Sequence, residues 1–410
     1  MSSLTQQDRT ALTRMRVINF LYGLTSSVMN YRVLYLSQQG LSATESGIVM
    51  CAAMVVGAIT PPIWGMVADS LRSKYRVFIL TAFGLSVTCA LVPTLGLLHI
   101  GGLLMASLLI PCTSAFSTPC QGIVDAAAVS CSMSIPGGDY SRLRMWMSIG
   151  YTLGNLALTP LVAGMGASIS FFASAGFALI LITQAKTVKD YEAPVTAPSE
   201  EAGVQERVSL SLLFKNYYLM IFLLINILIC IPSNCSQFLV YLLEDIGADT
   251  SLVGLVVAFR VAIECLALLF SANLKRRMPF STLMILSAVC FCIEMLGYQF
   301  TSDVVTLTIS CCFGGAAYGF VVATGINYVN MLCPRAMQAT AVSVWLSGGQ
   351  LAGMVCMLAG GAIIDALGVR AAFLCGLVCA LLWIILYLGS YFFGVKVLKK
   401  EPPITLKQKA

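Results

Sequence analysis

Charged side chains are scarce in this 410-residue chain, where Asp, Glu, Lys and Arg together make up 10% of the residues. A soluble globular domain carries about 25%. Hydrophobic residues make up 58% of the chain, and the mean hydropathy is +0.88. So few charges do not cover the surface of a soluble domain. The composition therefore predicts an integral membrane protein.

Histidine and the sequence patterns of enzyme sites are also missing or nearly so. The single histidine, His99, lies at the end of an apolar run, where we expect an interfacial residue rather than a ligand. The sixteen cysteines lie mostly inside apolar runs and show no disulfide or zinc spacing. No P-loop, HExxH motif or nucleophile elbow is present. We therefore expect neither an enzyme nor a resident metal or cofactor.

The sequence is rich in apolar runs that are long enough to cross a membrane. A helix needs about 20 residues to span the roughly 30 Å hydrocarbon core. We place twelve runs, with approximate ends, at 14–37, 44–68, 76–96, 100–131, 143–165, 168–187, 213–243, 250–273, 280–300, 303–331, 338–364 and 369–395. They predict an all-α protein with twelve transmembrane helices.

The basic residues set the orientation of these helices. The net charge of +6 invites a nucleic-acid reading, but the basic residues form short clusters between apolar runs, so no nucleic-acid partner is expected. With both termini inside the cell, inner segments hold clusters such as 72–76 and 396–400, whereas the outer loops hold only Arg370. This positive-inside pattern predicts an inner (plasma) membrane protein with cytoplasmic termini. The polar first dozen residues give no sign of a cleavable signal peptide.

One long polar segment, 188–212, divides the chain. It separates an N-terminal six-helix bundle (1–187) from a C-terminal one (213–395), which a cytoplasmic tail follows (396–410). A Tyr-Leu pair followed by two glycines recurs at 35–47 and 241–254, in the outer loop of each half. Parallel repeats with a binding site between the halves are a transporter design.

Two motifs resemble a known family. The segment GMVADSLRSKYR (65–76) resembles the loop motif of the major facilitator superfamily; Asp69, Arg72 and Lys74 match it, but the glycine expected shortly after the aspartate is absent. The segment DYSRLRMWMSIGY (139–151) is similar to the start of helix five in the lactose permease-like proton symporters, whose relatives include nucleoside and phenylpropionate transporters. Ser141 and Met147 replace two glycines of that pattern.

The resemblance covers essentially the whole chain and implies a fold and a site. The fold would be two six-helix bundles, related by pseudo-two-fold symmetry around a central cavity. Asp125 falls at the position of the family's helix-four carboxylate, and Arg144 at that of its arginine partner in substrate binding. Tyr151 falls where lactose permease has a tryptophan that stacks on a sugar ring. Glu264 matches the glutamate that links substrate binding to the proton.

The chain also departs from lactose permease. Glu294 stands where that permease has an arginine, and Arg260 is an addition. The segment 311–320 lacks the histidine and the glutamate of its proton relay. A different proton route is therefore expected.

Asp125 and Arg144 lie in consecutive apolar runs, where a charge costs about 2.5–3.5 kcal/mol on insertion scales. Facing a cavity, they would hold a polar solute by charge-assisted hydrogen bonds. The alternative is a structural ion pair that joins the two helices. We favour solute binding, because ionisable groups inside a membrane usually belong to functional sites.

Arg260 and Glu264 are four residues apart and share one helix face, and Glu294 lies on the next helix. One arginine does not satisfy two acids by fixed pairing, so one acid is expected to take a proton. Glu264 is our first choice as proton carrier and Glu294 the second, while Arg260 and Glu264 also contribute to solute binding. A purely structural triad is the alternative.

We assign the inner gate to Asp69, Arg72, Lys74 and Arg142, although a plain loop turn also explains the first three. Arg32, near the outer end of the first helix, is expected to extend to the membrane interface. If it faces the cavity instead, it would favour anionic substrates.

These features predict a monomeric secondary transporter that takes up a small polar solute, such as a sugar or a nucleoside, by proton symport and alternating access. Its partners would be the solute, protons and the lipid bilayer. Uptake of an organic or aromatic carboxylate is the alternative, supported by Arg32, Arg144 and Arg260. Drug efflux and a transporter-like sensor are further alternatives; drug sites are usually more aromatic, and a sensor needs a signalling partner.

Overall fold

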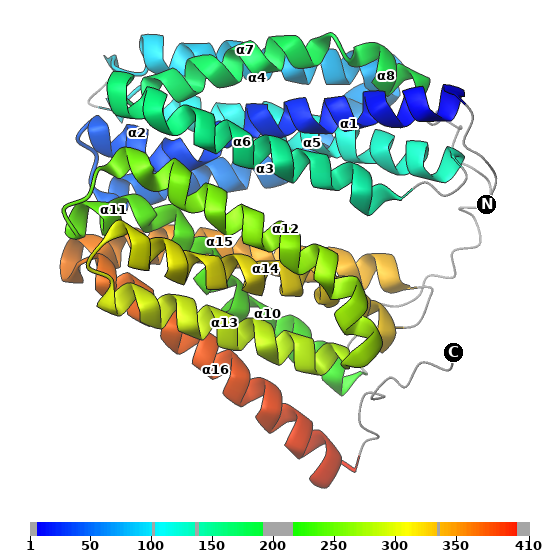
Figure 1. Ribbon diagram of the computed structural model, residues 1–410, viewed down its shortest axis with the longest axis vertical. Coiled ribbons are helices and arrows are strands. Elements are labelled where there is room, and N and C mark those ends of the chain that lie inside the picture. The colour runs from blue at the N-terminus through cyan, green and yellow to red at the C-terminus, as the bar shows by residue number, and fades with distance from the viewer. Residues whose placement is uncertain (1–5, 101–102, 136–138, 192–215, 334–336, 400–410) are drawn as a thin grey trace. The chain divides into compact units, whose positions relative to one another are not determined.

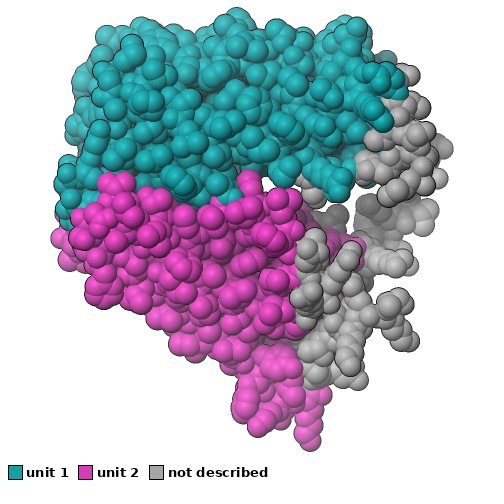
Figure 2. All heavy atoms as spheres, viewed as in Figure 1, with its two compact units in different colours: residues 1–197, 243–262 teal, residues 198–242, 263–410 magenta. Residues whose placement is uncertain are grey.

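A computed structural model describes residues 6–100, 103–135, 139–191, 216–333 and 337–399, and helices dominate it (Figure 1). The predicted linker 188–212 is described only at 188–191, and the tail 396–410 only as far as residue 399. The chain forms two compact units, shown in teal and magenta in Figure 2. Unit 1 comprises residues 1–197 and 243–262, and unit 2 comprises residues 198–242 and 263–410.

Unit 1 contains the elements from α1 to α8, together with the segment 243–262. Its helices are α1 (Gln6–Ser26), the 3-10 helix η1 (Ser27–Tyr31), α2 (Arg32–Gln38), α3 (Ala43–Leu71), α4 (Lys74–Leu95), α5 (Ala106–Ser134), α6 (Tyr140–Met165), α7 (Ser168–Ile182) and α8 (Ala185–Asp190). A core of buried apolar side chains, among them Ile18, Phe78 and Leu143, joins α1, α4, α5 and α6.

The remaining helices belong to unit 2, apart from the segment 243–262. They are α10 (Tyr217–Cys235), η3 (Ser236–Phe238), α11 (Leu239–Asp245), η4 (Thr250–Leu252), α12 (Val253–Arg277), α13 (Phe280–Phe300), α14 (Val304–Leu332), α15 (Gln338–Leu367) and α16 (Val369–Lys396). The helix α12 begins in unit 1 and ends in unit 2. Aromatic side chains form much of the core of unit 2, where the Trp383 and Tyr387 rings stack.

Eight of the described helical segments are long and apolar enough to cross a membrane. All twelve runs placed from the sequence overlap described helices, and these eight are among them. The protein is therefore a multi-pass membrane protein with an all-α fold.

Four of the predicted runs differ from the structure in their details. The first run is broken at η1, which separates α1 from α2, and the run placed at 213–243 is broken at η3, which separates α10 from α11. The run placed at 100–131 begins as helix only at Ala106, after a short antiparallel pairing of β1 (His99–Ile100) with β2 (Leu103–Leu104). The run placed at 168–187 divides into α7 and α8.

The helices α1 and α6 approach each other closely because glycine lies at their contact. A Cβ atom added at Gly23 would overlap the Met147 carbonyl oxygen, and one added at Gly150 would overlap that of Phe20. Both obstacles are backbone atoms, which do not rotate away. Small residues permit this kind of approach between membrane helices. The contact fixes the beginning of α6, which carries Arg144, against α1.

Candidate functional site

The structure brings Asp125 on α5 and Arg144 on α6 together. The Nε atom of Arg144 lies 3.4 Å from the Oδ1 atom of Asp125. The hydroxyl of Tyr140, at the first position of α6, donates to the same Oδ1 atom at 3.2 Å. Gln121, one turn before Asp125 on α5, is a further polar neighbour of its side chain. The carboxylate is thus held by two donors, both from the first turns of α6.

This ion pair remains accessible. The side chains of Asp125 and Arg144 are 26% and 36% exposed. Asp125 lies near the end of the run predicted at 100–131, and Arg144 lies at the start of the run predicted at 143–165. The side chain of Arg142, in the first turn of α6, is 81% exposed and pairs at 3.6 Å with Asp139, the residue before this helix. The accessible carboxylate and guanidinium at Asp125 and Arg144 are able to exchange part of their pairing for a polar solute.

A second polar network lies further along α6. The Tyr151 hydroxyl donates to the Asn30 Oδ1 atom at 2.8 Å, and the Asn30 amide donates to the Asn155 Oδ1 atom at 2.8 Å. The Asn155 amide donates back to the Tyr151 carbonyl at 2.8 Å. The Tyr31 hydroxyl contacts the Asn155 carbonyl at 3.2 Å and the Thr159 hydroxyl at 3.3 Å. The network joins η1 to α6 where the first membrane run is broken.

Arg32 does not extend to the interface, so that expectation was wrong. The residue is 4% exposed. Its Nη2 atom donates to the Thr113 hydroxyl at 2.6 Å, and its Nη1 atom donates to the Ser114 hydroxyl at 3.3 Å. Both acceptors lie on α5, and they hold the side chain inside unit 1 instead of letting it extend along the helix.

A polar stripe on α5 connects these features. Ser114, Ser117, Gln121 and Asp125 follow one another at intervals of three, four and four residues, which places them on one face of the helix. The Tyr22 hydroxyl of α1 donates to the Ser117 carbonyl at 2.8 Å. The sequence analysis did not identify Tyr22 or Asn155. The sequence signal for Asn155 was an asparagine one turn after Tyr151 within an apolar run, whereas the contact of Tyr22 with α5 is visible only in the structure.

The predicted proton-coupling acids lie on α12 and α13. Glu264 is half-buried on α12, four residues after the buried Arg260. A Cβ atom added at Gly319 of α14 would lie 2.9 Å from the Glu264 carbonyl oxygen, so α14 passes close to this turn of α12. Glycine at position 319 is what allows that passage.

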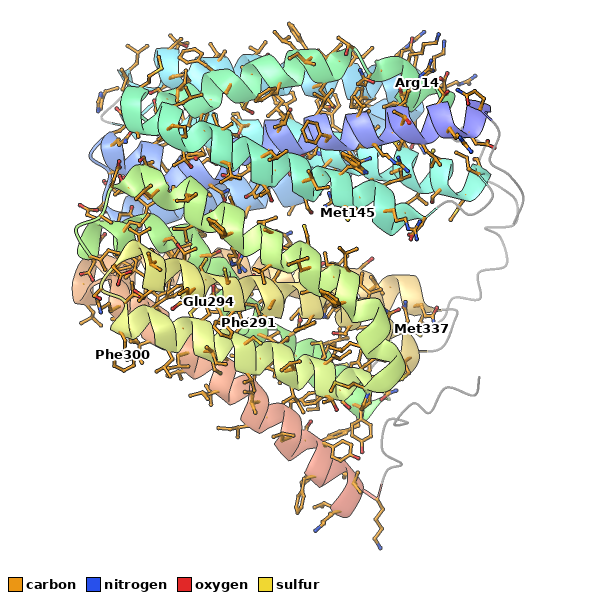
Figure 3. All side chains as sticks on the ribbon, in the orientation of Figure 1. Arg14, Met145, Phe291, Glu294, Phe300 and Met337 are labelled. Carbon is orange, nitrogen blue, oxygen red and sulfur yellow. The ribbon has the colours of Figure 1, made fainter. Side chains whose placement is uncertain are left out.

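Glu294 of α13 is fully buried inside unit 2 (Figure 3). The Tyr298 hydroxyl donates to its Oε1 atom at 2.7 Å. A Cβ atom added at Gly314 of α14 would overlap the Glu294 carboxyl group, so this glycine leaves the space that the carboxyl group fills. The carboxyl group of Glu294 is therefore enclosed between α13 and α14.

The loop after α3 contains Asp69, Arg72 and Lys74. Arg72 caps the helix in the left-handed conformation, with φ 48° and ψ 34°. Its N–H donates to the Asp69 carbonyl at 3.2 Å, and the Ser73 N–H donates to the Ala68 carbonyl at 3.2 Å. The tight turn is therefore kept although the family's glycine is absent, and Arg72 adopts the backbone conformation that glycine favours. Asp69 and Arg72 are exposed.

Among the residues that the structure describes, no group of three or more His, Cys, Asp or Glu side chains is placed to hold a metal ion.

A family model described as the MFS_1 like family matches residues 12–375. The chain belongs to this family. This confirms the prediction of a major facilitator superfamily member. Maltose permease of Geobacillus stearothermophilus is 24% identical over 359 residues, which cover 86% of this chain and 88% of the permease. The uncharacterized transporter YwbF of Bacillus subtilis (strain 168) is 23% identical over 358 residues, 85% of this chain and 86% of YwbF.

The fold is similar to that of solved major facilitator transporters. A crystal structure of a point variant of the nucleoside transporter NupG superposes with a TM-score of 0.78 at 15% identity, over 93% of this chain and 100% of that one. Family membership and fold together make this protein a membrane transporter of the major facilitator superfamily rather than an enzyme.

Proposed function

We propose that this family member is a proton symporter that takes up a small polar solute of the sugar or nucleoside type by alternating access. The names of two similar proteins, a maltose permease and a nucleoside transporter, support this solute class. The basic inner loops support a plasma-membrane location with both termini in the cytoplasm. Two six-helix bundles, 1–187 and 213–395, would rock about the site as a monomer.

The observation that carries this proposal is the Asp125–Arg144 pair with Tyr140. A carboxylate accepts hydrogens from solute hydroxyls and a guanidinium donates to solute oxygens, so the pair matches the two kinds of group on a sugar ring. Tyr151 lies seven residues after Arg144, two helical turns along the same face of α6. It offers an aromatic surface to an apolar ring face and a hydroxyl to the Asn30 network.

Proton coupling is assigned to Glu264 first and Glu294 second. Glu264 is half-buried beside Arg260 on α12, so its protonation changes a charge close to a buried guanidinium. Glu294 is enclosed and bound by Tyr298. Asp69, Arg72, Lys74 and Arg142 lie at the inner ends of helices, where they would close the inner gate. An acid that is protonated in one state and ionised in another couples the proton gradient to solute movement.

The test is uptake into proteoliposomes that contain the full chain, with an imposed pH gradient and radiolabelled maltose, glucose or uridine. We expect at least one of these solutes to accumulate only when the outside is acidic. Glu264→Gln should abolish accumulation but keep solute exchange between the two sides, because binding and rocking continue without the proton. Glu244→Gln, which changes an exposed acid at the end of α11, is the matched control and should accumulate solute normally.

Normal accumulation by Glu264→Gln would remove this residue from the proton route. The same experiment on Glu294→Gln would then assign the role to the second acid or to neither. Dependence of uptake on membrane potential separates the two solute classes. A neutral solute carried with one proton moves a net charge, whereas a monocarboxylate carried with one proton moves none.

A further inference from the structure

Among the described residues of unit 1, the buried guanidinium of Arg32 has no carboxylate partner. It forms no ion pair with any described carboxylate, and the charged groups at the other end of the α5 stripe, Asp125 and Arg144, already pair with each other. With 4% of the residue exposed, water does not replace the missing counter-charge. Buried charges in proteins are normally paired, because an unpaired charge in a medium of low dielectric constant is strongly unfavourable.

The hydrogen bonds of Arg32 do not neutralise its charge. Its two partners, Thr113 and Ser114, are neutral hydroxyls. The Thr113 hydroxyl donates its own hydrogen to the Ile110 carbonyl at 2.7 Å, so its oxygen is free to accept from Arg32 but carries no charge. The Arg32 Nε–H has no acceptor among the described residues. The side chain is therefore positioned by α5, while its Nε–H has no acceptor and its positive charge is not neutralised.

Arg32 also lies next to the polar networks of the site. It is two residues after Asn30, which binds Tyr151. Its partner Ser114 begins the α5 stripe that ends at Asp125, eleven residues later, a helical rise of about 16 Å. The stripe thus has an ion pair at one end and an uncompensated cation at the other. The electrostatic neighbours of the guanidinium within unit 1 are the neutral side chains of Cys89, Tyr22 and Tyr151.

We propose that Arg32 recognises a small anion. This rests on the proposed function and narrows it: the anion is either an acid group of the transported solute, as in a sugar acid, or an inorganic ion such as chloride that accompanies a neutral solute. Both sources offer the counter-charge and the acceptor that Arg32 lacks. In the described conformation the guanidinium is covered, so the anion reaches it when the η1 end of the site opens.

The experiment compares glucose and glucuronate, which differ only by the acid group, with chloride as a third probe. The melting temperature of the purified full chain is titrated with each probe for the wild type, Arg32→Met and the control Arg16→Met. Arg16 is an exposed arginine of the same membrane run, outside the site. An anion that binds elsewhere on the protein surface shifts the melting temperature of all three proteins equally. An anion that binds at Arg32 shifts the melting temperature of the wild type and Arg16→Met but not that of Arg32→Met.

We expect glucuronate to stabilise the wild type and Arg16→Met, with at least tenfold weaker binding to Arg32→Met, as loss of a charged hydrogen bond implies. A second outcome also supports the site: chloride stabilises the wild type but not Arg32→Met, and glucuronate stabilises neither. The occupant is then an inorganic ion. Arg32→Lys is the second variant, for the case in which Arg32→Met does not fold. It keeps the positive charge, so the anion should still stabilise it, but less than the wild type.

Equal responses of the wild type, Arg32→Met and Arg32→Lys to glucuronate and chloride would overturn the assignment. Failure of this kind is distinct from failure of the proposed function. If glucose stabilises all variants and the anions stabilise none specifically, the protein binds a neutral sugar and Arg32 is a structural residue. If no solute accumulates under a pH gradient, the proposed function itself fails, whatever the anions do.

Discussion

The hydroxyl of Tyr151 on α6 donates a hydrogen bond of 2.8 Å to the side-chain oxygen of Asn30 in η1. This bond ties the break in the first membrane run to the helix that carries Arg144. It also fixes the orientation of the Tyr151 ring, which is half-buried. The bond and the ring are separable by mutation, because Phe keeps the ring and Ala removes both.

We predict that Tyr151→Phe lowers the affinity for solute by less than tenfold and costs about 1 kcal/mol of stability, the usual net value of one hydrogen bond. Tyr151→Ala should weaken binding by tenfold or more, because the aromatic surface is lost with the hydroxyl. Isothermal titration with maltose, glucose and uridine measures both effects. A larger loss in Tyr151→Phe than in Tyr151→Ala would show that the ring is not a binding surface.

Arg72 gives a prediction about stability. Its left-handed backbone conformation costs a non-glycine residue about 1–2 kcal/mol. Glycine does not have this cost, but it loses more conformational entropy on folding, which offsets part of the gain. Arg72→Gly should therefore stabilise unit 1 by roughly 0.5–1 kcal/mol, seen as a higher melting temperature. Arg72→Ala removes the same charge but keeps the strain, and should not stabilise. If both variants change the transport rate to the same extent, the charge of Arg72 contributes to the gate. A lower melting temperature of Arg72→Gly than of the wild type would show that the backbone at Arg72 is not strained.

The glycine contact between α1 and α6 gives a prediction about packing. Gly150→Ala places a methyl group against the Phe20 carbonyl and should cost about 1–3 kcal/mol, the usual range for overpacking. Gly176→Ala is the control: it lies in the middle of α7 with no atom within 4 Å of an added Cβ, and should be neutral or slightly stabilising. Thermal unfolding compares the two. An equal melting temperature for both variants would mean that α1 and α6 do not touch at Gly150.

Asp303 gives a prediction about pH. It caps α14 by accepting the N–H groups of Val305 at 2.8 Å and Thr306 at 2.9 Å, and these bonds, the Thr306 bond first, lower the pKa of its carboxyl group. A lowered pKa in the folded state stabilises the protein above the ordinary pKa of Asp, and this stability is lost as the pH falls through the folded value. Asp303→Asn should therefore lower the melting temperature at pH 7, and this difference should shrink as the pH falls below the ordinary pKa of Asp. A difference that is independent of pH would show that the charge does not contribute.

Much of the fold follows from local sequence patterns. Apolar runs locate the membrane helices, and the motifs around Asp69 and Arg144 indicate the superfamily. The missing glycine in the first motif even marks the position where Arg72 is strained. These features depend on residues close together in the chain, which is why a sequence shows them.

The details of the site depend on contacts between distant segments. Asn30 and Asn155 are separated by 125 residues and meet only because Gly23 and Gly150 bring α1 against α6. The buried position of Arg32 depends on hydroxyls of α5 that a single sequence does not place opposite α2. Polar side chains in apolar helices were visible as candidates, but their partners were not.

The Asp125–Arg144 pair is the most direct test of the account, because an ion pair this exposed contributes no more than about 1 kcal/mol to stability. Solute binding is measured by titration calorimetry with maltose, glucose and uridine for Asp125→Asn, Arg144→Gln, the double variant and the control Arg14→Gln, which breaks the exposed pair with Asp190. We predict at least tenfold weaker binding in both single variants and in the double variant, with small changes in melting temperature and a normal control. Normal binding by the double variant would contradict the account, because it would make the pair a structural link between α5 and α6 and not the site of the solute.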